Sequence, residues 1–151
     1  MQSTPSSSAQ TTAVSDSGSP FALGVMLLDD ESAYLDLLGQ LLGEHLACPV
    51  HSFSRPAAAL AALPTLNLGL IVTDYHMPGM DGLEFLAEVQ KLKPGLPAVM
   101  ITAHEIVLGS ERAQRVPALK AVVRKPFKWM ALAEEINRFW TGSRPPFPFV
   151  R

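Results

Sequence analysis

The stretch LGLIVTDYHMPGMDGLEF occupies residues 68–85 of the chain. It opens with the uncharged run LGLIVT at residues 68–73, which is typical of a strand that a parallel sheet buries on both faces. Asp74 follows this run directly, and the Pro-Gly pair that ends at Gly79 predicts a turn. Asp81 is a good N-cap residue for a helix that begins immediately after it. The stretch therefore predicts a buried strand, an aspartate at its carboxyl end, and a helix that returns along the sheet.

The same alternation of segments extends in both directions from this stretch. Further apolar runs predict strands near residues 22–28, 49–53, 97–101 and 121–124. Amphipathic segments predict helices near residues 31–46, 56–63, 105–116 and 128–140. Five strands that alternate with helices predict a doubly wound α/β domain with a five-stranded parallel sheet, because right-handed crossovers place helices on both faces.

Two of the predicted helices differ in the regularity of their pattern. The helix at residues 31–46 carries one apolar stripe that is expected to face the sheet, made of Tyr34, Leu37, Leu38, Leu41 and Leu42. The helix at residues 105–116 is less regular, because Gly109 interrupts it and Pro117 closes it.

The two ends of the chain differ in composition from the region between them. Residues 1–20 are rich in Ser, Thr and Gln and predict a disordered N-terminal tail, since they cannot bury enough apolar surface to offset the entropy of ordering. Residues 141–151 contain three prolines and predict a Pro-rich C-terminal tail. The folded domain is expected at residues 21–140.

The composition argues against several classes of protein. Every apolar run is far shorter than the roughly 20 residues that cross a bilayer, so no membrane insertion is expected. Twelve Lys and Arg against fourteen Asp and Glu leave no basic excess, so no direct nucleic-acid binding is expected. Cys48 is the only cysteine, which excludes an internal disulfide and fits a location in a reducing cytoplasm.

Polar residues follow four of the predicted strands: Asp29, Asp30, Asp74, Thr102 and Lys125. Parallel strands present their carboxyl ends at one edge of the sheet, where doubly wound domains bind ligands, so these side chains are expected to meet. Three neighbouring carboxylates repel one another, and a hard divalent ion such as Mg²⁺ would offset that repulsion. An ammonium and a hydroxyl suit the oxygens of a transferring phosphoryl group. The pattern favours phosphoryl transfer.

Four segments, LLDDES, IVTDYHMPGMDGLEFL, VMITAH and VVRKPF, resemble the motifs of the bacterial response-regulator receiver family. The resemblance covers about residues 22–140. It implies a flavodoxin-like receiver fold with strand order 2-1-3-4-5. It also implies a phosphoacceptor in a two-component phosphorelay, of the stand-alone kind found in chemotaxis regulators.

The resemblance assigns a metal site to the acidic residues. Asp30 resembles a direct Mg²⁺ ligand, Asp29 a ligand that acts mostly through water, and Asp74 a ligand that is also the phosphoacceptor. The backbone carbonyl of His76 would complete the protein ligands, and Mn²⁺ would be able to replace Mg²⁺.

The resemblance also assigns roles in phosphoryl transfer. Lys125 resembles the lysine that pairs with the phosphoryl group, next to a cis bond to Pro126, and Thr102 resembles the hydroxyl that follows this group. Such a domain is not a conventional enzyme, but it assists its own phosphorylation and autodephosphorylation. The implied partners are a sensor histidine kinase or a histidine phosphotransfer protein, and a downstream protein target.

The sequence departs from the family pattern at two places. Val122 stands three residues before the motif lysine, where the family usually has a switching Tyr or Phe. Residues 118–119 replace a common Gly-Ala pair. His76 and His104 each lie two residues after a site residue, and we hypothesise that they alter the lifetime of the phosphoryl group, although two solvated loop histidines are the simpler interpretation.

Three alternative interpretations remain. The chain can be a receiver-like binding module that signals without phosphorylation, an idea that Val122 and the irregular helix at residues 105–116 support. It can also be the receiver fragment of a longer regulator. A haloacid-dehalogenase-like phosphatase is disfavoured, because that chemistry requires a second acid at the position that His76 occupies.

Overall fold

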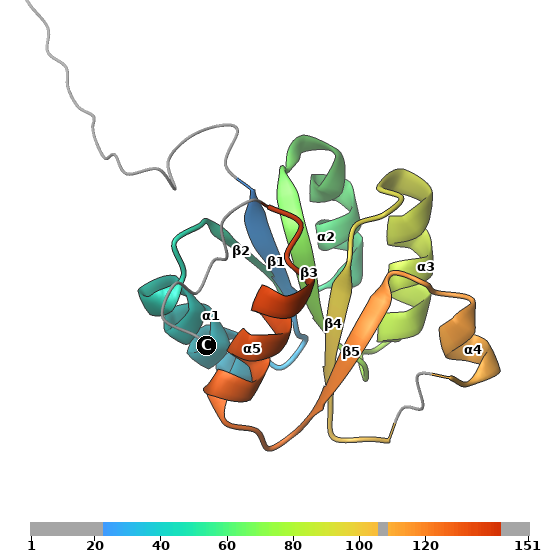
Figure 1. Cartoon of the computed structure of the whole chain (residues 1–151). Helices are drawn as coiled ribbons and strands as arrows, with labels where there is room; N and C mark the ends of the chain where they lie inside the picture. The colour runs from blue at the N-terminus through green and yellow to red at the C-terminus, as the bar shows by residue number, and fades with distance from the viewer. Residues whose placement is uncertain (1–22, 106–108, 143–151) are drawn as a thin grey trace, which may run out of the picture.

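A single parallel sheet forms the centre of the protein. The computed structural model describes residues 23–105 and 109–142, and Figure 1 shows their arrangement. The sheet has the order β2-β1-β3-β4-β5. Its strands are β1 (Gly24–Leu28), β2 (Val50–Phe53), β3 (Leu68–Asp74), β4 (Ala98–Thr102) and β5 (Leu119–Arg124). The predicted doubly wound fold and the 2-1-3-4-5 strand order are both confirmed.

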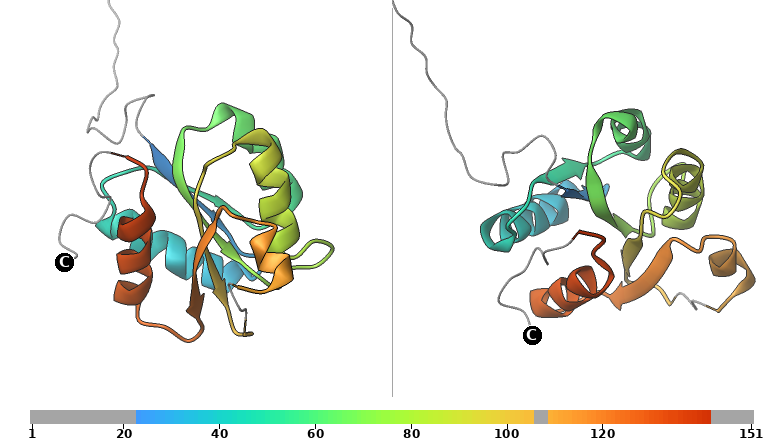
Figure 2. Two further views of the ribbon diagram at one scale, coloured as in Figure 1. Left: turned by 45° about the vertical axis from the view of Figure 1, so that its right-hand side comes forward. Right: turned by 45° about the horizontal axis from the view of Figure 1, so that its top comes forward.

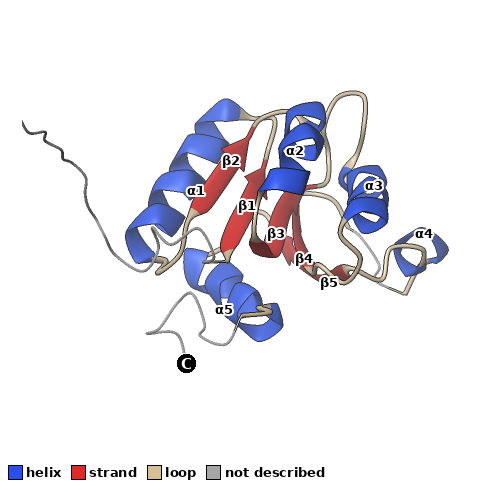
Figure 3. Cartoon of the chain, turned by 90° about the horizontal axis from the view of Figure 1, so that it is seen from above, coloured by secondary structure: helices blue, strands red, loops and turns tan. Residues whose placement is uncertain are grey.

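Helices cover both faces of the sheet. They are α1 (Ser32–His45), α2 (Pro56–Ala62), α3 (Gly82–Leu92), α4 (Glu111–Gln114) and α5 (Trp129–Phe139), and the short 3₁₀ turn η2 (Leu63–Thr65) follows α2. Helices α1 and α5 pack on one face, and α2, α3 and α4 pack on the other. Figure 2 shows the sheet between α5 and α3, and Figure 3 shows the same layers from above.

Each face of the sheet has its own hydrophobic core. Successive residues of a strand point to opposite faces, so β1 sends Met26 to the core under α2 and α3, and Leu27 to the core under α1 and α5. Every residue of β1, β3 and β4 is buried, as the continuous apolar runs predict. The edge strand β5 instead alternates between buried and more exposed residues. This burial holds the carboxyl ends of β1, β3 and β4 at fixed positions.

The start of α3 is tied closely to the end of β3. Asp81 accepts a hydrogen bond from the Glu84 backbone N–H at 2.9 Å, and the Glu84 carboxylate accepts one from the Asp81 N–H at 2.9 Å. This capping box satisfies two backbone donors at the helix start and confirms the predicted N-cap. Gly82 donates its N–H to the Tyr75 carbonyl at 2.7 Å. A Cβ on Gly82 would lie 2.5 Å from the Asp74 carbonyl oxygen, so the close approach requires glycine.

The predicted apolar stripe of α1 is partly wrong. The residues that α1 buries are Leu35, Leu38 and Leu42, whereas 52% of Leu37 is exposed. Tyr34 is half-buried and packs at the margin of the core under α1 and α5. The helix is therefore rotated about its axis relative to the prediction, and tertiary packing rather than residue spacing sets that rotation.

The fourth helix is shorter than the predicted segment at residues 105–116. It begins after Ser110, whose hydroxyl accepts a hydrogen bond from the Ala113 backbone N–H at 3.3 Å, and it ends at Gln114. Glu105 lies outside any helix, and residues 106–108 lie outside the described part of the chain. Ser110 is the N-cap, which places the start of the helix after Gly109 rather than before it.

Both predicted tails fall largely outside the described residues, namely all of residues 1–20 and residues 143–151. Thr141 is described, and its hydroxyl donates to the Gly69 carbonyl at 2.9 Å. Within residues 23–105 and 109–142, no helix has the length and hydropathy that a membrane crossing needs.

Candidate functional site

Three carboxylates meet at the carboxyl edge of the sheet. Asp29 and Asp30 follow β1, and Asp74 is the last residue of β3. One oxygen from each carboxylate lies within 4.8 Å of the others. Asp29 is fully buried, Asp74 is buried and Asp30 is exposed. The structure therefore brings the three predicted acidic residues together, with one of them open to solvent.

Asp29 is held in place by two contacts. Its Oδ1 accepts a hydrogen bond from the Glu31 backbone N–H at 2.9 Å, and its Oδ2 lies 3.4 Å from the ammonium of Lys125. Burial raises the pKa of Asp29, and the Glu31 N–H and Lys125 only partly oppose that rise. The position of this carboxylate is thus fixed, but its charge is poorly compensated.

Lys125 lies between the two buried carboxylates. Its Nζ is 3.4 Å from Asp29 Oδ2 and 3.4 Å from Asp74 Oδ1, and 17% of its side chain is exposed. Burial lowers the pKa of Lys125, but the two carboxylates together outweigh this influence and raise it. The backbone N–H of Lys125 donates to the Thr102 carbonyl at 2.8 Å, and the predicted cis bond to Pro126 is present. Lys125 therefore remains charged and faces both acids.

The charge at Asp74 is also incompletely balanced. Burial raises the pKa of Asp74, and the nearby Lys125 ammonium lowers it by less than burial raises it. Buried carboxylates without full compensation favour the binding of a cation, and closely spaced oxygen ligands suit a hard divalent metal. The geometry thus fits a divalent metal site, with Asp29, Asp30 and Asp74 as the residues that would hold the ion.

Thr102 occupies the carboxyl end of β4, beside Asp74. Strands β3 and β4 pair so that Asp74 is opposite Ile101, and Thr102 is the next residue along β4. Thr102 is fully buried, and its Oγ1 accepts a hydrogen bond from the His104 backbone N–H at 2.9 Å. This bond uses an acceptor position of the hydroxyl and leaves its proton able to donate.

Two histidines flank the acidic site. The rings of His76 and His104 have centroids 5.5 Å apart, although they come from the loops after β3 and β4. Both residues are exposed. The structure therefore places the two predicted histidines as exposed neighbours.

Sequence reasoning missed a contact made by Tyr34. The ammonium of Lys125 lies 4.3 Å from the centroid of the Tyr34 ring, within the range of a cation–π interaction. The helical pattern marked Tyr34 only as part of an apolar stripe. The contact depends on the rotation of α1, so no local sequence signal could have identified it.

A second missed contact connects α4 to the loop after β3. The guanidinium of Arg112 lies 2.8 Å from the Asp81 carboxylate and donates to the Tyr75 hydroxyl at 3.3 Å. Arg112 is therefore the residue through which the short α4 contacts the N-cap of α3.

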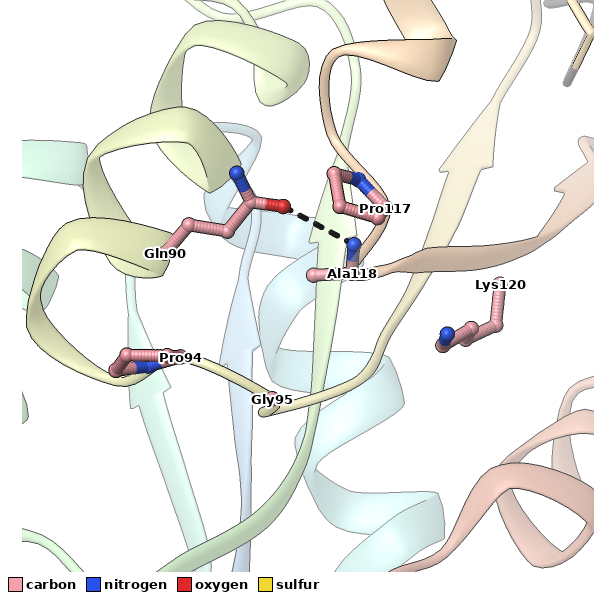
Figure 4. Close-up of a pocket in the computed structure, with 6 residues that line it drawn as sticks. All are labelled: Gln90, Pro94, Gly95, Pro117, Ala118 and Lys120. Carbon is pink, nitrogen blue, oxygen red and sulfur yellow. Dashed lines mark hydrogen bonds between the residues drawn. The ribbon is translucent and has the colours of Figure 1, made fainter.

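A separate cavity of about 330 Å³ lies at the opposite edge of the sheet. Figure 4 shows its lining residues, which are Gln90, Pro94, Gly95, Pro117, Ala118 and Lys120. The Gln90 side-chain oxygen accepts a hydrogen bond from the Ala118 backbone N–H at 3.1 Å. The lining contains no carboxylate, so this cavity does not compete with the acidic site as the place of phosphoryl chemistry.

A match to a protein family agrees with the fold and the acidic site. The chain matches the family described as response regulator receiver domain over residues 25–137 of its 151 residues. The chain belongs to the response regulator receiver domain family. Its class of function is accordingly that of a phosphoacceptor in a two-component system.

Individual relatives agree with this assignment. Response regulator protein FleR of Pseudomonas aeruginosa is 34% identical over 127 residues, which are 82% of this chain and 26% of FleR. Transcriptional regulatory protein FixJ of Bradyrhizobium diazoefficiens is 33% identical over 104 residues, which are 69% of this chain and 50% of FixJ. The chain thus spans about a quarter of FleR and half of FixJ.

A solved structure shows the same architecture. Response regulator protein TrrA of Thermotoga maritima, in complex with Mg(2+)-BeF, matches with a TM-score of 0.68 and 25% identity. The match covers 78% of this chain and 98% of TrrA.

Proposed function

We propose that this receiver domain accepts a phosphoryl group on Asp74 from a phosphohistidine of a sensor histidine kinase or a histidine phosphotransfer protein. The observation that carries the proposal is the cluster of three carboxylates within 4.8 Å, with the Lys125 ammonium 3.4 Å from two of them. Asp74 has a partly accessible carboxylate, with 9% of its side chain exposed. Asp29 is too deeply buried to receive a phosphoryl group, because none of its side chain is exposed.

In the proposed transfer, a carboxylate oxygen of Asp74 attacks the donor phosphorus. The new P–O bond forms as the P–N bond to the donor imidazole breaks, and the electron pair of that bond stays on the imidazole nitrogen. Lys125 offers its ammonium to the phosphoryl oxygens, and Thr102 offers its hydroxyl proton. Water then attacks the phosphorus, the P–O bond to Asp74 breaks, and inorganic phosphate leaves as the Asp74 carboxylate is restored. The domain thereby assists both its own phosphorylation and its own dephosphorylation.

The metal in this proposal is Mg²⁺, and Mn²⁺ is able to replace it. Asp29, Asp30, Asp74 and the backbone carbonyl of His76 would hold the ion, because oxygen ligands suit both metals. When bound, the ion neutralises charge on the phosphoryl oxygens and on the carboxylates.

Phosphorylation would change the contacts of this domain with a downstream protein target. A negatively charged group on Asp74 gives Lys125 and Thr102 new acceptors, and their movement can shift the surrounding loops between two arrangements. The free thiol of Cys48 is consistent with a protein that functions in the reducing cytoplasm.

A second proposal concerns the length of the regulator. The chain spans about a quarter of FleR, so we propose as an alternative that it acts as the receiver segment of a longer regulator.

The proposal is tested with beryllofluoride and Mg²⁺, which together imitate an aspartyl phosphate. Wild-type protein is expected to show a saturable change in tryptophan fluorescence, because Trp129 lines the same surface groove as Lys125. Asp74→Asn is expected to abolish the change, and Asp36→Asn, at an exposed position of α1, is expected to leave it intact. No saturable change in fluorescence or in amide NMR spectra of the wild type would reject phosphorylation and favour a module that signals without it.

A further inference from the structure

The contact between Tyr34 and Lys125 adds a third neighbour to the ammonium at the site. Tyr34 lies in the first turns of α1, and its ring centroid is 4.3 Å from Lys125 Nζ. The Phe127 ring meets the Tyr34 ring edge-on, with centroids 6.2 Å apart and planes at 85°. This aromatic contact restricts the orientation of the Tyr34 ring, because edge-to-face pairs are favourable arrangements.

The ammonium needs a third contact because neither carboxylate binds it tightly. Both oxygen distances are 3.4 Å, whereas a charge-assisted hydrogen bond usually measures about 2.7–2.9 Å. The lysine side chain has four flexible bonds and gives up considerable rotamer freedom when it is fixed. Two loose ionic contacts alone would allow the ammonium to pair closely with Asp29 or Asp74, or to turn away from both.

Open space beside the lysine makes the last of these movements possible. A groove of about 530 Å³ runs between α1 and the start of α5. Its lining includes Tyr34 and Leu37 from α1, and Lys125 and Phe127 from the segment between β5 and α5. The Tyr34 ring stands where the ammonium borders this groove, since both residues line it.

We propose that Tyr34 is a positioning residue, whose ring keeps the Lys125 ammonium between Asp29 and Asp74 and ready to meet the phosphoryl oxygens. The face of the ring attracts the cation electrostatically without neutralising it, so Lys125 keeps its full charge for the phosphoryl group. The inference rests on the proposed function, because the position of Lys125 matters to transfer only if Asp74 is the phosphoacceptor.

The test measures beryllofluoride affinity in the presence of Mg²⁺ for variants of Tyr34, by amide NMR spectra of the full chain. Tyr34→Phe keeps the aromatic face and is expected to bind within about twofold of wild type. Tyr34→Leu keeps an apolar side chain without the face and is expected to bind about fivefold to thirtyfold more weakly, the range of a partly buried cation–π contact. Leu37→Ala, which changes the same groove and helix at a largely exposed position, is the matched control and is expected to bind as wild type does.

A fluorinated ring separates positioning from packing. Pentafluorophenylalanine placed at position 34 retains the ring and its apolar surface but withdraws electron density from its face. It is expected to bind beryllofluoride about as weakly as Tyr34→Leu does. Equal affinity of the fluorinated ring and Tyr34→Phe would overturn the inference, as would wild-type affinity in Tyr34→Leu. Absence of any beryllofluoride response in wild type would instead reject the proposed function, and the inference with it.

Discussion

Gly82 allows a test of how closely α3 must approach the end of β3. In Gly82→Ala, the new Cβ would lie 2.5 Å from the Asp74 carbonyl oxygen and 2.8 Å from the Met100 Cε. The methionine can move, but the carbonyl belongs to a buried strand and cannot move freely. Overpacking of this kind costs about 1–3 kcal/mol. The higher helix propensity of alanine offsets at most about 1 kcal/mol of this cost, and less at the first residue of a helix.

We therefore expect Gly82→Ala to lower the free energy of unfolding by about 1–3 kcal/mol in urea titrations. The slope of that free energy against urea concentration is expected to stay unchanged. Beryllofluoride affinity is expected to fall about tenfold or more, because the clash displaces the backbone that carries Asp74. Gly43→Ala is the matched control: its Cβ would meet nothing within 4 Å, and it is expected to stabilise the protein by about 0.5–1 kcal/mol. Wild-type stability in Gly82→Ala would refute the close approach of α3 to Asp74.

Three further predictions concern the surroundings of the site. Burial raises the pKa of Asp74 above the ordinary aspartate value of about 4. The group therefore stabilises the folded state fully below about pH 4, and this stabilisation is lost as the pH rises through the raised pKa. Without divalent cations, the stability of Asp74→Asn relative to wild type should thus increase in urea titrations as the pH rises above about 4, and a constant difference would contradict the raised pKa. His76→Ala combined with His104→Ala should change the decay rate of the phosphorylated protein, measured by intact mass, because the rings lie 5.5 Å apart beside the site; an unchanged rate would favour two solvated loop histidines. Asp81→Ala should cost about 1 kcal/mol through loss of the N-cap, whereas Arg112→Ala should cost less than about 1 kcal/mol, because 51% of the Arg112 side chain is exposed to solvent. Equal losses in thermal unfolding would show that the ion pair, and not the cap, carries the effect of Asp81→Ala.

The sequence was sufficient to predict the fold and the grouping of the site residues. A parallel sheet brings the carboxyl ends of its strands to one edge, so a residue that follows a buried strand has a defined place. This rule predicts that Asp29, Asp74, Thr102 and Lys125 lie together, and the strand pairing and ion-pair distances agree with it.

Features that depend on how a helix is rotated could not be predicted in this way. Tyr34, Leu37 and Leu38 all fit an apolar stripe at helical spacing, but only packing against the sheet decides which of them is buried. Leu38 is buried, Leu37 is exposed, and Tyr34 reaches Lys125. The cation–π contact follows from that rotation and has no signature in local sequence.

The short fourth helix shows a different limit. Weak periodicity allowed a helix anywhere from residue 105 to residue 116, and the side-chain cap at Ser110 decided its start. The family's usual aromatic is absent at Val122, which is half-buried and packs against the core under α2 and α3. The sequence could report this absence but could not show that an aromatic ring contacts Lys125 from α1 instead.

The role of Asp74 is open to direct measurement. The full chain is incubated with acetyl phosphate and Mg²⁺, and its intact mass is followed over time. Wild-type protein and Asp36→Asn should each gain the mass of one phosphoryl group, and Asp74→Asn should gain none. Equal labelling of Asp74→Asn, or no labelling of the wild type, would contradict the assignment of Asp74 as the phosphoacceptor.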